Sequence, residues 1–279
     1  MTFATNALEF GRTEAVEQVE GRLDAGVLFL CDHATNCLPA AYGRLGLPAA
    51  ELQRHIAYDI GAAHITRRLA RIFSAPALLT GFSRLLIDAN RGADDPTLVM
   101  QLADGNVIPG NAGISAAEIE NRRQLYWQPY RDAVASTIER MAASCLVPAV
   151  LSVHSFTPSF KGVVRPWQVG VLWDSDARFA APLIEALGAR GFVVGDNEPY
   201  DGALEGDTLD AEITTRGLAG LLIEIRQDLL ETEELAIAFA ERLAEVLRPI
   251  LARPELHETK FHPSRTGRHR PPGVEKTIV

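Results

Sequence analysis

Short apolar runs alternate with amphipathic stretches along the chain. The strand-like runs are VLFLC at 27–31, PALLT at 76–80, RLLID at 84–88, VPAVLSV at 147–153, QVGVLWD at 168–174, FVVG at 192–195 and LAGLLIEI at 218–225. Apolar residues recur at helical spacing in 59–73, 177–191 and 232–251. Ser115 and Glu118 form a capping box that opens a helix to about residue 143, which Pro129 kinks or splits. This alternation predicts an α/β protein with a mostly parallel or mixed central sheet and helices on both faces.

Composition narrows the class of protein. The chain has 279 residues, a formal net charge of −9 and 47% apolar residues, as is typical of a soluble globular protein. We predict one α/β domain over residues 1–252 and a basic, flexible C-terminal tail over 253–279, where apolar periodicity ends. The acidic balance argues against binding of nucleic acid or an anionic membrane.

Location is predicted from what the sequence lacks. No apolar run approaches the ~20 residues that span a bilayer, and the first residues do not resemble a secretory signal. Three cysteines give no disulfide framework and suit a reducing compartment. We therefore expect a cytoplasmic protein that acts on a small molecule, and a homo-oligomer remains possible.

Polar residues follow several of the predicted strands. These are Asp32, His33 and Asn36 after the first strand, Asp88, Asn90 and Arg91 after 84–88, His154 after VLSV, and Glu224 with Arg226 in the last strand, together with Asp59 at a helix start. Because ligands of parallel α/β sheets bind at the carboxyl ends of the strands, we expect these side chains to converge. Histidines, carboxylates and arginines together supply the metal ligands, general base and anion clamp of a metal-assisted hydrolase.

Each of these residues also has a purely structural interpretation. A single histidine at a strand end is more often a packing residue than a ligand. Glu224 could form a buried ion pair with Arg226 or Arg84, because a buried carboxylate is costly unless it is paired or functional. Asp59 could simply cap the helix that follows it.

Six segments resemble the N-formylglutamate amidohydrolase family, in the order found in that family. They are CDHATNCLP, HIAYDIGA, SRLLIDANR, SVHSF, DNEPY and EIRQDLL, and they extend from about residue 27 to 230. The segments LSVHSFTP and DANR also resemble parts of zinc carboxypeptidases and of the succinylglutamate desuccinylase and aspartoacylase group. The resemblance implies a phosphorylase/hydrolase-like, zinc carboxypeptidase-like fold with one catalytic zinc.

The resemblance also implies the metal ligands. His33 and His154 are similar to zinc ligands of the family, and a hydrolytic zinc takes three protein ligands. The carboxypeptidase pattern HxxE has Asn36 in place of its glutamate here, and a neutral amide is a poor zinc ligand. We therefore expect Asp59 to be the third ligand, with Asn36 as the alternative or as a substrate contact.

The remaining roles implied by the resemblance concern the substrate. Glu224 is similar to the catalytic glutamate and would act as general base, and Arg84 would stabilise the oxyanion. Asn90 and Arg91 would bind a substrate carboxylate, and Arg226 would bind a second one or orient Glu224. The implied activity is zinc-dependent removal of an acyl group, formyl in the first place, from an acidic amino acid such as N-formylglutamate. The alternatives are hydrolysis of another N-acyl amino acid or small peptide, or a catalytically decayed homologue that binds a metabolite.

Overall fold

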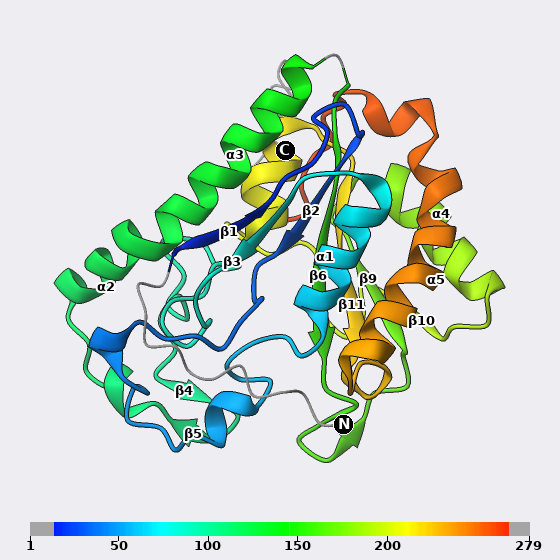
Figure 1. The fold of residues 1–279 in the computed structure, drawn as a ribbon. Helices are drawn as coiled ribbons and strands as arrows, with labels where there is room; N and C mark the ends of the chain where they lie inside the picture. The colour runs from blue at the N-terminus through cyan, green and yellow to red at the C-terminus, as the bar shows by residue number, and fades with distance from the viewer. Residues whose placement is uncertain (1–13, 145, 268–279) are drawn as a thin grey trace, which may run out of the picture.

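The computed structural model describes residues 14–144 and 146–267, and a seven-stranded sheet forms its centre (Figure 1). The strand order is β1-β3-β2-β6-β11-β9-β10. The strands are β1 (Val16–Val19), β2 (Val27–Cys31), β3 (Ala77–Thr80), β6 (Ala149–Phe156), β9 (Val169–Leu172), β10 (Val194–Asp196) and β11 (Gly220–Arg226). The four central strands β3, β2, β6 and β11 are mutually parallel, whereas β1 and the β9–β10 pair run antiparallel to them.

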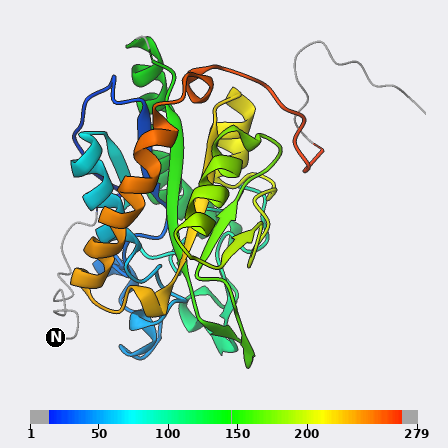
Figure 2. The same ribbon diagram turned by 90° about the vertical axis from the view of Figure 1, so that its right-hand side faces the viewer.

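Helices cover both faces of this sheet. Successive side chains of β2 alternate between two cores, with Phe29 in one and Leu30 in the other. Figure 2 shows α1 (Ala62–Phe73), α5 (Glu233–Leu251) and α4 (Ala177–Ala189) over the first face. The second face packs against α3 (Gln128–Ala143), which continues α2 (Ala116–Arg122) through a π-helical turn at Arg123–Trp127. The predicted fold class is confirmed.

One predicted strand is wrong. Residues 84–86 form a turn and 87–88 are irregular, so no strand forms, although Leu85, Leu86 and Ile87 are fully buried in the second core. The Ser83 hydroxyl donates to the Ala57 carbonyl and accepts from the Leu85 N–H, which fixes the turn. The apolar run therefore reports burial and not strand pairing. Two short hairpins were also not expected: β4 (Leu102–Ala103) with β5 (Asn106–Val107), and β7 (Ser159–Phe160) with β8 (Val163–Val164).

The described part of the predicted tail, residues 253–267, packs against the α/β domain. A short helix at Pro254–His257 follows α5, and both ring nitrogens of His257 bond to carbonyls, those of Val147 and Leu251. The Arg265 guanidinium bonds to Asp201 in the loop after β10. The first 13 residues and the last 12 lie outside the described residues, so the domain division remains a prediction. None of the described helices combines the length and apolar character that a membrane span requires.

Candidate metal centre and active-site cavity

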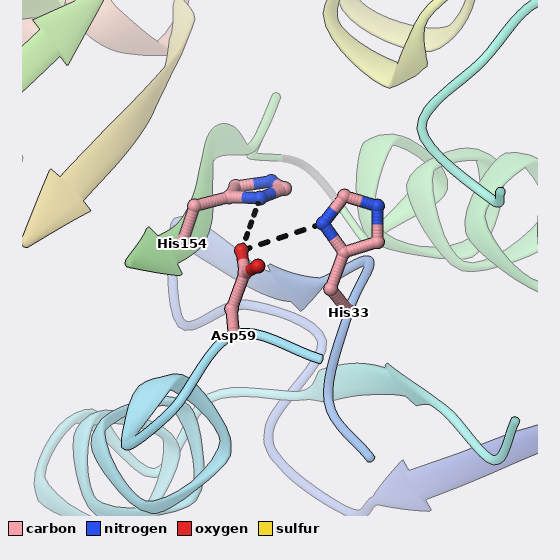
Figure 3. A group of neighbouring side chains, drawn as sticks. All are labelled: His33, Asp59 and His154. Carbon is pink, nitrogen blue, oxygen red and sulfur yellow. Dashed lines mark hydrogen bonds and ion pairs between the residues drawn. The ribbon is translucent and has the colours of Figure 1, made fainter. Parts of the chain in front are cut away.

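Three side chains from distant parts of the chain meet beside the sheet. His33 follows β2, Asp59 precedes α1, and His154 lies within β6 (Figure 3). The Asp59 Oδ2 atom is 3.3 Å from Nδ1 of His33 and 3.0 Å from Nδ1 of His154. All three side chains are buried, and their candidate ligand atoms lie within 4.8 Å of one another. They form a possible metal-binding triad.

Asp59 is positioned by the backbone around it. Its N–H donates to the His33 carbonyl at 2.9 Å, and its Oδ2 accepts from the Ser155 N–H at 3.3 Å. Helix α1 begins after Gly61, whose φ of 82° is easily adopted by glycine, and no side chain caps that helix. The capping interpretation of Asp59 is therefore wrong. Burial alone would raise the pKa of this carboxyl, but the two histidines hold the pKa well below its usual range.

The donor set fits a metal ion such as zinc. The outer ring nitrogen of His33 lies 2.7 Å from Asp88 Oδ1, and that of His154 lies 3.0 Å from Asp32 Oδ2. If each Nε2–H donates to its carboxylate, each Nδ1 lone pair faces the Asp59 oxygen. Carboxylates that orient ligating histidines in this way are a general feature of protein metal sites. Two imidazoles and one carboxylate are a ligand set typical of catalytic zinc.

Asp32, whose carboxylate lies next to His154, accepts several hydrogen bonds. Asp32 Oδ2 accepts from the Ser152 hydroxyl at 2.6 Å, and Oδ1 accepts from the hydroxyls of Tyr130 at 2.9 Å and Thr208 at 2.8 Å. Burial opposes ionisation, yet hydrogen bonds and the adjacent His154 keep the pKa of Asp32 well below its usual range. Asp32 is therefore a fixed anion that sets the orientation of one proposed ligand.

We predict that Asp32→Asn weakens zinc binding by about 10–100-fold, because the amide keeps the shape of the side chain but removes the charge behind His154. Competition with a chromophoric chelator measures the affinity. Asp24→Asn is the matched control, since Asp24 is an exposed surface carboxylate that pairs with Arg22. Equal zinc affinity in the two variants would show that Asp32 does not position His154.

Glu224 stands next to the triad. It is the register partner of His154 in the parallel pair of β11 and β6, so both side chains emerge on the same face of the sheet. Its side chain is buried, and its Oε2 atom has no hydrogen-bond partner among the described residues. Burial is the main reason that the pKa of Glu224 is raised to about 7, and the negative charge of Asp59 adds to this effect. Such a carboxyl can accept and return a proton near neutral pH.

The predicted ion pairs of Glu224 do not form. Arg84 bonds to Asp88 at 2.9 Å and lies 3.4 Å from Asp59. Arg226 pairs with Asp228 and donates to the main-chain carbonyls of residues 165–167. The Glu224 carboxyl is thus left facing the cavity instead of closing a salt bridge.

A cavity of about 410 Å³ joins the triad to the predicted substrate contacts. Its wall includes His33, Asp59, His154, Glu224, Arg84, Asn90 and Arg91. Asn90 Oδ1 accepts from the Thr208 N–H, which fixes that side of the cavity. The volume lies within the range of about 300–1,000 Å³ typical of small-molecule sites.

Two sequence-predicted residues lie elsewhere. The Asn36 amide donates to the Leu52 carbonyl at 2.8 Å, and Arg226 is engaged as described above. Neither belongs to the cavity wall. Conversely, sequence analysis did not select His55, Phe160, Tyr200 or Asp207, which do line it. His55 and Tyr200 lie in two of the family-like segments, HIAYDIGA and DNEPY, whereas Phe160 and Asp207 lie outside all six.

Asp207 is a second buried carboxyl of the cavity wall, and burial raises its pKa to about 7 from an ordinary value of 3.8. Between pH 3.8 and about pH 7, Asp207 keeps its proton in the folded protein but has released it in the unfolded chain. The free energy of unfolding therefore falls as the pH rises through this range. We predict that Asp207→Asn removes this fall. The variant is expected to match the native protein near pH 4 and to be more stable by about 4 kcal/mol at pH 8.

Urea unfolding at pH 4 and at pH 8 measures the difference in the free energy of unfolding between Asp207→Asn and the native protein. Asparagine keeps an oxygen for the Asp210 N–H, which Asp207 Oδ1 accepts at 2.7 Å. Asp132→Asn on the exposed side of α3 is the control and is expected to change stability little at either pH. A constant difference across the pH range would contradict the proton linkage.

The chain is similar to known proteins over most of its length. The chain matches the family model described as N-formylglutamate amidohydrolase over residues 25–231, which confirms the resemblance seen in the six segments. A gene product of Agrobacterium tumefaciens has a crystal structure similar to this fold, with 33% sequence identity, a TM-score of 0.80 and coverage of 86% of this chain and 95% of that chain. The N-formylglutamate amidohydrolase of Ralstonia eutropha shares the fold at 20% identity and a TM-score of 0.65, with coverage of 86% and 98%. No curated protein matches the chain.

Proposed function

Since the chain belongs to the N-formylglutamate amidohydrolase family, and is thus an amidohydrolase, we propose that it is zinc-dependent and removes the formyl group of N-formylglutamate. The observation that carries the proposal is the buried Glu224 carboxyl, whose Oε2 atom has no hydrogen-bond partner in the described part of the chain, beside a His/Asp/His triad in one cavity. A general base and a metal-binding triad within one wall are the parts needed for hydrolysis of an unactivated amide.

Each polar residue of the cavity wall has a separate role in the proposed reaction. Arg91 with Asn90 would bind a carboxylate of the substrate, because a desolvated anion needs a cationic partner. Glu224 would take a proton from the attacking water and return it to the leaving nitrogen. The Arg84 guanidinium lines the cavity next to Asp59 and would stabilise negative charge on the acyl oxygen. A zinc ion held by His33, Asp59 and His154 would supply Lewis-acid polarisation and a lowered water pKa.

The test is formate release from N-formyl-L-glutamate by the purified protein. We expect turnover that a chelator abolishes and added zinc restores. N-formylpropylamine, which has no carboxylate for Arg91, is expected to react at least about 100-fold more slowly, since the cationic wall is then left without its partner. Absence of formate, or full activity in the metal-free protein, would overturn the proposed function.

A further inference from the structure

One part of the cavity wall is apolar and aromatic. Phe156, Phe160 and Tyr200 line it together with Leu172, Leu204 and Leu222. Phe156 ends β6 two residues after His154, Phe160 lies in the β7–β8 hairpin, and Tyr200 lies in the loop that follows β10. Phe160 and Tyr200 are 41% and 45% exposed, although both face the cavity, so they present apolar surface that a ligand could cover.

Arg165 holds the three rings together. Its guanidinium carbon lies 5.7 Å from the ring centre of Phe156, 5.0 Å from that of Phe160 and 5.1 Å from that of Tyr200. Arg165 itself is only 8% exposed and does not belong to the cavity wall. These cation–π contacts hold the three rings next to one another in the ligand-free protein. We refer to Phe156, Phe160 and Tyr200 as the aromatic wall.

The aromatic wall and the carboxylate-binding residues belong to the same cavity but come from different segments. Asn90 and Arg91 lie in the loop after β3, whereas Phe156 ends β6 and Phe160 and Tyr200 follow it in the chain. The loop after β10 connects the two groups, because it leads from Tyr200 to Thr208, whose N–H donates to Asn90. An acyl amino acid with its carboxylate at Arg91 and its amide at Glu224 would have its acyl group in the cavity that the aromatic wall lines.

A formyl group cannot use this surface, because its carbon carries only hydrogen besides the amide. We propose that the aromatic wall is an acyl subsite, and that the substrates include N-acyl amino acids whose acyl group is aromatic or branched apolar, such as arylacetyl. This inference rests on the proposed function for the scissile amide. In the reaction, water adds its oxygen to the acyl carbon, the C–N bond breaks, and the leaving nitrogen takes up both water protons, which gives an arylacetate and the amino acid in its ammonium form.

The experiment compares N-phenylacetyl-L-glutamate with N-formyl-L-glutamate by kcat/KM on the zinc-loaded protein. We expect both to be hydrolysed. Phe160→Ala is expected to lower kcat/KM for the phenylacetyl substrate about tenfold or more and for the formyl substrate by less than about threefold, because only the former covers the ring. Val163→Ala is the matched control, since Val163 lies in the same hairpin, is 69% exposed and does not line the cavity.

One further variant and an independent binding measurement complete the test. Arg165→Met is expected to raise KM for the phenylacetyl substrate with kcat retained, since Arg165 acts as a positioning residue through the rings. Hydrolysis of the formyl substrate alone, or an equal effect of Phe160→Ala on both substrates, would overturn the subsite and leave the proposed function intact. If neither substrate reacts, saturation-transfer NMR with phenylacetate decides: binding that Phe160→Ala abolishes supports the subsite, and no binding overturns it.

Discussion

Replacement of Glu224 by glutamine is expected to lower kcat for N-formylglutamate hydrolysis by about 10²–10⁴-fold, the range for loss of a general acid–base group. Glutamine has nearly the same shape, but it cannot accept a proton from water or return one to the leaving nitrogen. Glu224 lies beside the triad without belonging to it, so the zinc content of the variant is expected to stay unchanged. Formate release and metal analysis of the same preparation measure the two effects separately.

Glu241→Gln is the matched control for this prediction, because Glu241 is exposed on α5 and pairs with Arg68 at the surface. Glu224→Gln also removes a buried carboxyl with a raised pKa, so it is not expected to unfold the protein. Retention of more than about a tenth of the native kcat by Glu224→Gln would place the general base elsewhere, since such a loss is well below the acid–base range.

The sheet could be predicted from sequence because its central strands are buried on both faces. The run VLFLC is apolar at every position and LAGLLIEI at every position except Glu224, as expected for parallel strands between two helical layers, and they appear as β2 and β11. The same signal failed at 84–88, where a turn held by Ser83 places an apolar run in the second core without pairing it to a strand. Apolar runs thus predict burial reliably and strand pairing only when a neighbouring strand is available.

The candidate site could be predicted for those residues whose positions are set by the ends of the central strands. His33 and His154 follow from the carboxyl ends of β2 and β6, and Glu224 follows from a single charge in an apolar strand. The aromatic wall was not predictable, because its rings meet through Arg165, which belongs to none of the strands that carry the site. The loop that bears Tyr200 is similarly fixed from a distance: Asn197 Oδ1 accepts from the N–H groups of Trp173 and Gly202.

Asn36 and Asp59 were the two candidates for a third ligand, and their positions now predict different results. Asp59→Ala is expected to reduce zinc affinity by more than the about 10–100-fold expected for a residue that only orients a ligand. It removes the one carboxylate oxygen that faces both Nδ1 atoms, at 3.3 Å from His33 and 3.0 Å from His154. Asn36→Ala is expected to leave zinc affinity nearly unchanged, because its amide donates to the Leu52 carbonyl outside the cavity wall.

Thermal and urea unfolding with and without zinc test this difference independently of activity. A ligand that binds only the folded state stabilises it by about 2.7 kcal/mol at a free concentration of 100 times Kd. The native protein and Asn36→Ala are therefore expected to gain this stability from zinc, and Asp59→Ala to gain little at the same concentration. Because Asp59 also pairs with Arg84 and both histidines, the variant is expected to be less stable than the native protein without metal as well. The zinc-dependent increment, not the absolute stability, therefore identifies the ligand, and an equal increment in Asp59→Ala and the native protein would exclude Asp59 from the metal site.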